Sequence, residues 1–223
     1  MFQETILPCS LCHTRKEKRF CLALHDRICP RCCGTERERT LDCPGECPYL
    51  QQARQQEKPR SLEELGQEEL FRDVELGQRF FYDHEPLITG LLYGIAKIAA
   101  THKDWTDQEY LQALTEITRA TATRAGSGLI LQENTPNPIQ QLLHEEIENM
   151  ITQYRQLEEQ HLGYFKLKDS EVLCVLVFLV RMGQSRTNGR RKSRVFLDSL
   201  RAQFSVQTAP PGVVPGSNSL IIP

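Results

Sequence analysis

The stretch from Cys9 to Cys47 reads Cys9-Ser-Leu-Cys12, then Cys21, then Cys29-Pro-Arg-Cys32-Cys33, then Cys43-Pro-Gly-Glu-Cys47. It contains eight of the nine cysteines of this 223-residue chain. The ninth, Cys174, lies in an apolar run far from the others. This confinement predicts a small cysteine-rich head, residues 1–58, followed by a separate body.

Two pairs in this stretch have the spacing of a zinc ribbon. Two residues between cysteines allow one tight turn to place two thiolates at adjacent corners of a tetrahedron. The pairs Cys9/Cys12 and Cys29/Cys32 are separated by sixteen residues, as in zinc ribbons. The N-terminus shows no secretory signal, and in a reducing compartment thiols persist. We therefore expect a cytoplasmic protein with Zn²⁺ on these four cysteines.

The other four cysteines of the head are enough for a second metal site. They are Cys21, Cys33, Cys43 and Cys47. Cys33 follows Cys32 directly, so in an extended segment its side chain points to the opposite side, and one segment then serves two metals. His13 and His25 are alternative ligands, because imidazole also binds zinc. We predict two zinc ions rather than one, with the pairing of ligands left open.

The excess of thiolates favours a structural metal over a catalytic one. A catalytic zinc keeps an open coordination position and uses histidine or carboxylate ligands more often than four thiolates. The chain also shows no glycine-rich phosphate loop and no nucleophile elbow. We therefore expect a protein that is not an enzyme, and predict no catalytic residues.

Outside the cysteines, the head is expected to contain little regular structure. Alternation over residues 15–28 predicts a short β-hairpin between the two knuckles. Pro48 is typical of the first turn of a helix, expected to run to Lys58. The charged run Glu36–Arg39 is expected to be a solvated connection.

Residues 59–204 are predicted to form an all-helical body of about six helices, so the fold class is mainly α. Two capping boxes, Ser61-Leu-Glu-Glu64 and Thr106-Asp-Gln-Glu109, mark helix starts. The first predicts a helix to about Tyr82, and Pro86 predicts the start of another. Further helices are expected from Pro138, from Asp169 and over residues 193–204, with an extended crossover at 126–138. Residues 205–223, rich in Pro, Gly and Ser, are expected to be a flexible tail.

The longest apolar runs, residues 87–100 and 172–182, are shorter than the ~20 residues that a membrane span needs. They predict buried core helices, and we expect no membrane association.

The order of the ligand pairs resembles known zinc fingers. Cys-x2-Cys, then Cys-Pro-x-Cys, then Cys-x3-Cys before a helix is similar to the interaction fingers of the HIT and MYND kinds. The segments around Cys29–Arg37 and Asp42–Leu50 also resemble a head found in uncharacterised bacterial proteins. The first resemblance implies interleaved ligand pairs around two zincs and a protein-binding role. It departs at Gln51 and Gln55, where those fingers have a terminal His and Cys.

Three classes of function follow from these features. The first is a non-enzymatic zinc module that binds another protein or regulates it. The second is nucleic-acid binding, for which the candidate residues are Arg186, Arg190, Arg191, Lys192 and Arg194, with further basic residues at 15–19 of the head. The formal net charge of −2 offers no global attraction to a polyanion. The third is an iron–sulfur centre or thiol redox sensor, since clustered thiolates also hold iron.

Overall fold

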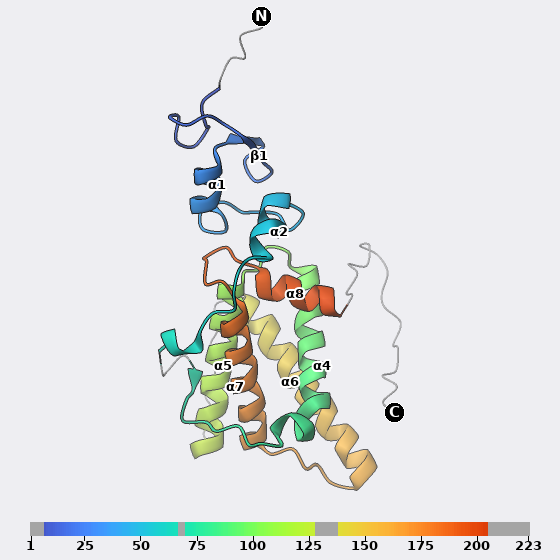
Figure 1. Cartoon of the computed structure of the whole chain (residues 1–223). Helices are drawn as coiled ribbons and strands as arrows, with labels where there is room; N and C mark the ends of the chain where they lie inside the picture. The colour runs from blue at the N-terminus through green and yellow to red at the C-terminus, as the bar shows by residue number, and fades with distance from the viewer. Residues whose placement is uncertain (1–6, 67–69, 128–137, 205–223) are drawn as a thin grey trace, which may run out of the picture.

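The structure, a computed structural model, describes residues 7–66, 70–127 and 138–204. It confirms the predicted fold class: a cysteine-rich head with a short β-hairpin precedes a helical body (Figure 1). The head stands at one end of an elongated molecule, next to the end of the body that carries α8.

The head is built from a β-hairpin and two short helices of seven residues each. Strands β1 (Arg19–Cys21) and β2 (Asp26–Ile28) pair antiparallel. Helices α1 (Pro30–Glu36) and α2 (Pro48–Arg54) each begin at a proline. Proline is tolerated there because an N–H in the first turn of a helix has no hydrogen-bond partner within the helix. The predicted hairpin and helix start at Pro48 are therefore confirmed, although α2 ends at Arg54 rather than Lys58.

The body packs four long helices and a short one around a single apolar core. They are α4 (Phe80–Thr101), α5 (Asp107–Ser127), α6 (Pro138–Leu162), α7 (Asp169–Arg186) and α8 (Val195–Gln203). Helix α5 packs against α6 and α7, and α4 packs against α6 and α8. Helix α8 lies across the ends of the long helices that face the head (Figure 1).

Helix α7 is the central element of this core. Five of its residues are almost wholly excluded from water, with at most 1% exposed: Val175, Leu176, Val177, Leu179 and Val180. Each such side chain contributes about 1.5–3 kcal/mol when fully buried. The apolar runs singled out in the sequence therefore form buried helices. Among the helices of the described residues, none combines the length and apolar character that a membrane crossing requires.

The helix predicted from Ser61 to Tyr82 does not form. Within the described residues, a 3₁₀ turn, η1 (Leu62–Glu64), follows Ser61, whose hydroxyl accepts from the N–H of Glu63. Phe71 adopts a φ of 49°, which interrupts any helix. The Arg181 guanidinium on α7 donates to three nearby backbone carbonyls, at distances of 2.6–2.9 Å: those of Leu70, Phe71 and Val74. A tertiary contact thus replaces the local helical hydrogen bonds.

Of the other predicted helix starts, the one at Pro86 is wrong and those at Thr106, Pro138 and Asp169 are confirmed. Pro86 lies inside α4, which begins six residues earlier at Phe80, so the predicted start was wrong. The capping box at Thr106 is confirmed: the Glu109 N–H donates to the Thr106 hydroxyl at 3.2 Å, and the Thr106 N–H donates to the Glu109 carboxylate at 2.9 Å. Helices also begin at Pro138 and Asp169 as expected. Most of the predicted crossover at 126–138, and the tail from residue 205, lie outside the described residues.

Candidate metal centre

The first knuckle is held by the backbone around Cys9. The N–H of His13 donates to the carbonyl of Cys9 at 2.8 Å, and the N–H of Cys9 donates to the carbonyl of Arg15 at 2.8 Å. His13 has a φ of 53°, the left-handed conformation that closes such a tight turn. These contacts direct the side chains of Cys9 and Cys12 toward the same point.

The second knuckle begins where β2 ends. Cys29 is the N-cap of α1, and its sulfur accepts from the N–H of Cys32 at 3.4 Å. The N–H of Cys29 in turn donates to the sulfur of Cys9 at 3.1 Å. The second knuckle therefore supplies backbone donors to the sulfurs of Cys9 and Cys29, which stabilises the thiolate form that a metal requires.

The two knuckles bring four sulfurs together in one cluster. The Sγ atoms of Cys9, Cys12, Cys29 and Cys32 all lie within 4.8 Å of one another, and those of Cys12 and Cys29 are 4.0 Å apart. Tetrahedral zinc with Zn–S bonds of about 2.3 Å requires sulfur separations of about 3.8 Å. Three of the four side chains are buried, and Cys12 is half-buried. This cluster can hold a metal ion with all four corners filled by sulfur.

The protonation of the four thiols differs because they share hydrogen bonds. Hydrogen bonds from the Thr14 side chain and backbone lower the pKa of Cys12 to about 5. The backbone N–H of Cys32 lowers the pKa of Cys29. The hydrogen bond to Cys29, followed by burial, raises the pKa of Cys32 to about 12. The low pKa of Cys12 favours its thiolate, whereas Cys32 has to lose its proton when a cation binds.

The other four cysteines of the head are not gathered in the same way. Within the described residues, the four-sulfur cluster is the one group of potential metal ligands that converges. Cys43 nevertheless lies near Cys21 and Cys47: burial raises its pKa, and the charges of those two thiols raise it further. The sulfur of Cys33 accepts from two guanidinium groups, at 3.4 Å from Arg19 and 3.6 Å from Arg37.

The two candidate histidine ligands lie outside the four-sulfur cluster. His13 and His25 are exposed, and both have positive φ values, 53° and 52°. His13 closes the first knuckle, and His25 lies in the turn of the hairpin. Both positions therefore serve turns of the backbone.

The prediction that the charged run Glu36–Arg39 is a solvated connection was wrong for Glu38, which is buried. Its side chain is 1% exposed and accepts from Arg54 at 2.8 Å and from the Asn188 amide at 2.8 Å. Arg54 also donates to Asp198 on α8 at 2.8 Å. Burial lowers the pKa of Arg54, but the hydrogen bonds to Asp198 and Glu38 outweigh burial and raise it above its ordinary value. Glu38 and Arg54 thus form a charged junction between head and body.

The basic cluster near the C-terminal end contributes to the same junction. Arg190 lies 3.3 Å from Glu57 and 3.6 Å from Glu38, and Lys192 lies 3.7 Å from Asp42. Arg194 pairs with Asp198 and donates to the carbonyl of Trp105 at 2.6 Å. The remaining two members, Arg186 and Arg191, are exposed. Three of the five candidate phosphate-binding residues are therefore engaged within the chain.

Comparisons of the chain with protein-family models, curated proteins and solved structures gave no match.

Proposed function

We propose that this chain is a non-enzymatic zinc-binding protein whose head is a protein-interaction or regulatory module. The observation that carries the proposal is the convergence of the four sulfurs of Cys9, Cys12, Cys29 and Cys32 within 4.8 Å. Four thiolates saturate a tetrahedral ion and leave no position for water or substrate, as in structural zinc sites. The metal then stabilises the folded head and takes no part in a reaction.

The size of the head supports a structural role for the metal. Its small core contains Ile28 and Leu41 together with buried cysteines. A segment of this size buries too little apolar surface to fold on that basis alone. Metal binding therefore contributes a large part of the folding free energy of the head.

We further propose a second zinc on Cys21, Cys33, Cys43 and Cys47. Its support is the proximity of Cys43 to Cys21 and Cys47. Cys32 and Cys33 lie on helix α1 rather than on the extended segment expected from the sequence, so their side chains diverge by about 100° instead of pointing to opposite sides. This site requires the side chain of Cys33 to exchange its contacts with Arg19 and Arg37 for the metal. The cluster of Cys9, Cys12, Cys29 and Cys32 is complete without these four cysteines, so the first site can be filled when the second is lost.

Elemental analysis of the purified full chain tests both sites. We expect two zinc equivalents in the native chain and a loss of zinc in Cys29→Ser. Cys43→Ser/Cys47→Ser distinguishes the sites: two sites predict that it retains one equivalent. A single equivalent in the native chain, unchanged in Cys43→Ser/Cys47→Ser, removes the second site. If anaerobically purified protein contains iron and absorbs visible light, the site holds an iron–sulfur centre and not zinc.

A further inference from the structure

We infer that the outer face of the β-hairpin is a docking surface for an acidic segment of a partner protein. We define this hairpin face by three residues: Lys18, Phe20 and Arg27. The inference rests on the proposed function, because the metal cluster fixes the hairpin, and it adds the surface and the chemistry of the partner.

Strand pairing places these three side chains on one face. Phe20 is directly opposite Arg27 in the antiparallel pair, and side chains directly opposite project to the same side. Lys18 precedes Phe20 by two residues and continues the pairing, with its N–H donating to the carbonyl of Ile28 at 3.1 Å. Cys21, which alternates with Phe20, is 8% exposed and points into the head.

The hairpin face combines apolar and cationic surface. Phe20 is 47% exposed, a large fraction for an aromatic ring on a small domain. Lys18 is exposed, and the side chain of Arg27 is 60% exposed even though it lies 3.8 Å from Glu17. Leu24 in the hairpin turn and Leu11 in the first knuckle are also exposed, at 39% and 38%. Aromatic and basic side chains together are typical of protein-binding surfaces.

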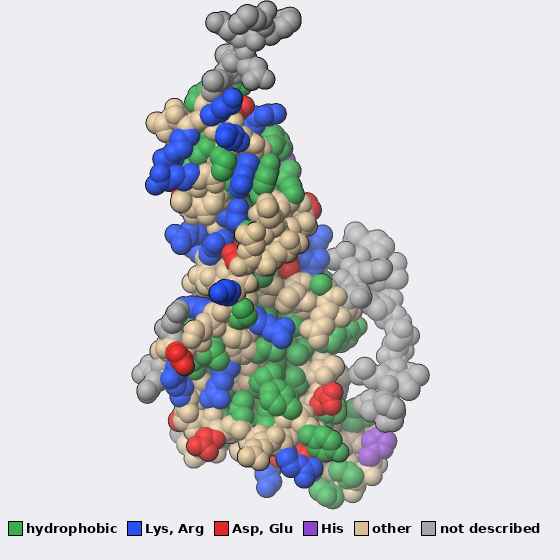
Figure 2. All heavy atoms as spheres, viewed as in Figure 1, with side chains coloured by type: hydrophobic (Ala, Val, Ile, Leu, Met, Phe, Trp, Pro, Cys, Tyr) green, Lys and Arg blue, Asp and Glu red, His purple; other side chains and the backbone are tan. Residues whose placement is uncertain are grey.

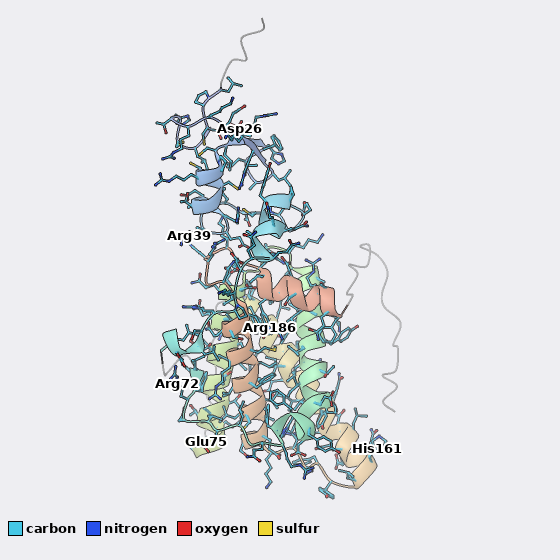
Figure 3. The ribbon with its side chains drawn as sticks, in the orientation of Figure 1. Asp26, Arg39, Arg72, Glu75, His161 and Arg186 are labelled. Atoms are coloured by element: carbon cyan, nitrogen blue, oxygen red, sulfur yellow. The ribbon has the colours of Figure 1, made fainter. Side chains whose placement is uncertain are left out.

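The charge around this face selects an acidic partner. Residues 7–43 contain eight Lys or Arg and five Asp or Glu. Among the acidic residues, Glu38 is buried against Arg54, and two are exposed, Asp26 and Asp42. Figure 2 shows Lys and Arg side chains gathered over the head with few Asp or Glu between them, whereas charges on the body are mixed. Figure 3 shows that the labelled Asp26 lies at the hairpin and Arg39 at the end of the head nearer the body.

The charge of the metal cluster favours a protein over a nucleic acid as the partner. Each zinc ion with four thiolates carries a net charge of −2, so the two proposed sites together offset the excess of basic residues in the head and remove its positive field at long range. A polyphosphate depends on that field, whereas a short acidic segment depends on local contacts to exposed cations and on an apolar anchor. The exposed ring of Phe20 supplies such an anchor for a leucine or an aromatic side chain of the segment.

The test uses the zinc-loaded full chain and a short fluorescein-labelled peptide of Asp, Glu and Leu residues, followed by fluorescence anisotropy at about 50 mM salt. We expect saturable binding that weakens about tenfold in Lys18→Glu/Arg27→Glu. Lys103→Glu, an exposed lysine of the body, is the control and should bind as the native chain does. If the double variant loses zinc, Phe20→Ser replaces it, and we again expect weaker peptide binding at unchanged zinc content.

An oligothymidylate of the same length is titrated in parallel. Binding of oligothymidylate without binding of the peptide overturns the inference in favour of a nucleic acid. Failure to bind either probe, or equal peptide binding by the native chain and the variants, also overturns it. These outcomes leave the proposed zinc module intact when the chain holds zinc, whereas a zinc-free native chain contradicts the proposed function itself.

Discussion

Glu38 accepts a hydrogen bond from Arg54 at 2.8 Å while only 1% of its side chain is exposed. Arg54 donates with its other terminal nitrogen to Asp198, so one guanidinium joins the loop after α1 to helix α8. Glu38 has a φ of 53°, which costs backbone energy for a non-glycine residue. The junction therefore relies on well-placed hydrogen bonds between charged groups, and the metal cluster positions the segment that carries Glu38.

Replacing Glu38 by Gln should destabilise the metal-loaded chain by about 1.5–3 kcal/mol, because the hydrogen bond from Arg54 and the ion pair with Arg190 lose the negative charge of the acceptor. Urea unfolding at constant zinc concentration measures this difference. Glu46→Gln, which changes an exposed carboxylate of the same head, is the matched control and should stay within about 0.5 kcal/mol of the native chain. Equal stability of Glu38→Gln and the native chain would show that the junction contributes nothing.

Removing the metal should unfold the head and leave the body folded. Trp105 is the sole tryptophan of the chain, is 2% exposed and lies in the body, so its fluorescence reports the body alone. Helices α1 and α2 are seven residues each, so the far-UV signal of the long helices should persist after chelation. We expect protease cleavage within residues 9–47 on chelation, with unchanged tryptophan emission. A red-shifted tryptophan emission on chelation would mean that head and body unfold together.

Asp107 provides a pH-dependent test within the body. Its carboxylate, on the first residue of α5, accepts from the Thr187 and Ser193 hydroxyls and from the N–H groups of Phe196 and Leu197, at 2.9–3.2 Å. Burial raises its pKa above the ordinary 3.8, although these hydrogen bonds oppose the shift. The folded chain therefore holds this proton more tightly than the unfolded chain does.

The stability that this proton contributes is complete below pH 3.8 and is lost as the pH rises through the folded-state value. Asp107→Asn cannot titrate, so the free energy of unfolding of the native chain minus that of the variant should fall as the pH rises above 3.8. Urea unfolding across this range measures the difference. A difference that grows with pH would instead show that the hydrogen bonds favour the carboxylate over the acid.

Close packing of α5 on α7 depends on Gly183. A Cβ at this position would lie 2.6 Å from Leu111 Cδ2 and 3.4 Å from Phe196 Cε1, both in the core. Gly183→Ala should therefore cost about 1–3 kcal/mol in thermal or urea unfolding, despite the better helix propensity of alanine. Gly126→Ala on α5 is the control, since among the described residues no atom beyond its chain neighbours and its own helix backbone lies within 4 Å of a Cβ there, and it should be neutral or stabilising. A stabilised Gly183→Ala would show that Leu111 moves aside freely.

The parts of the structure that the sequence predicts are those with local causes. The two Cys-x2-Cys knuckles depend on residues three positions apart, and the Thr106 capping box on a reciprocal bond to Glu109. Proline at the first turn fixed the starts of α2 and α6 in the same way. Each of these features is contained within a few residues, so propensity and spacing are sufficient.

The predictions that were wrong concern segments whose structure depends on distant residues. The segment after Ser61 resembles a helix, but Arg181, more than a hundred residues later, binds its carbonyls and holds a different path. Glu38 stands in a run of four charges typical of solvent exposure, yet Asn188, 150 positions away, comes to it from the body. No local pattern signals such partners, so burial of this carboxylate was not predictable.

The most direct test of the central claim is the metal content of the full chain purified under reducing conditions, compared with that of Cys29→Ser. We expect bound zinc in a colourless native protein, loss of zinc from Cys29→Ser, and a lower melting temperature of the head in that variant. A native chain without bound metal, whose thermal melting is unchanged by Cys29→Ser, would contradict it.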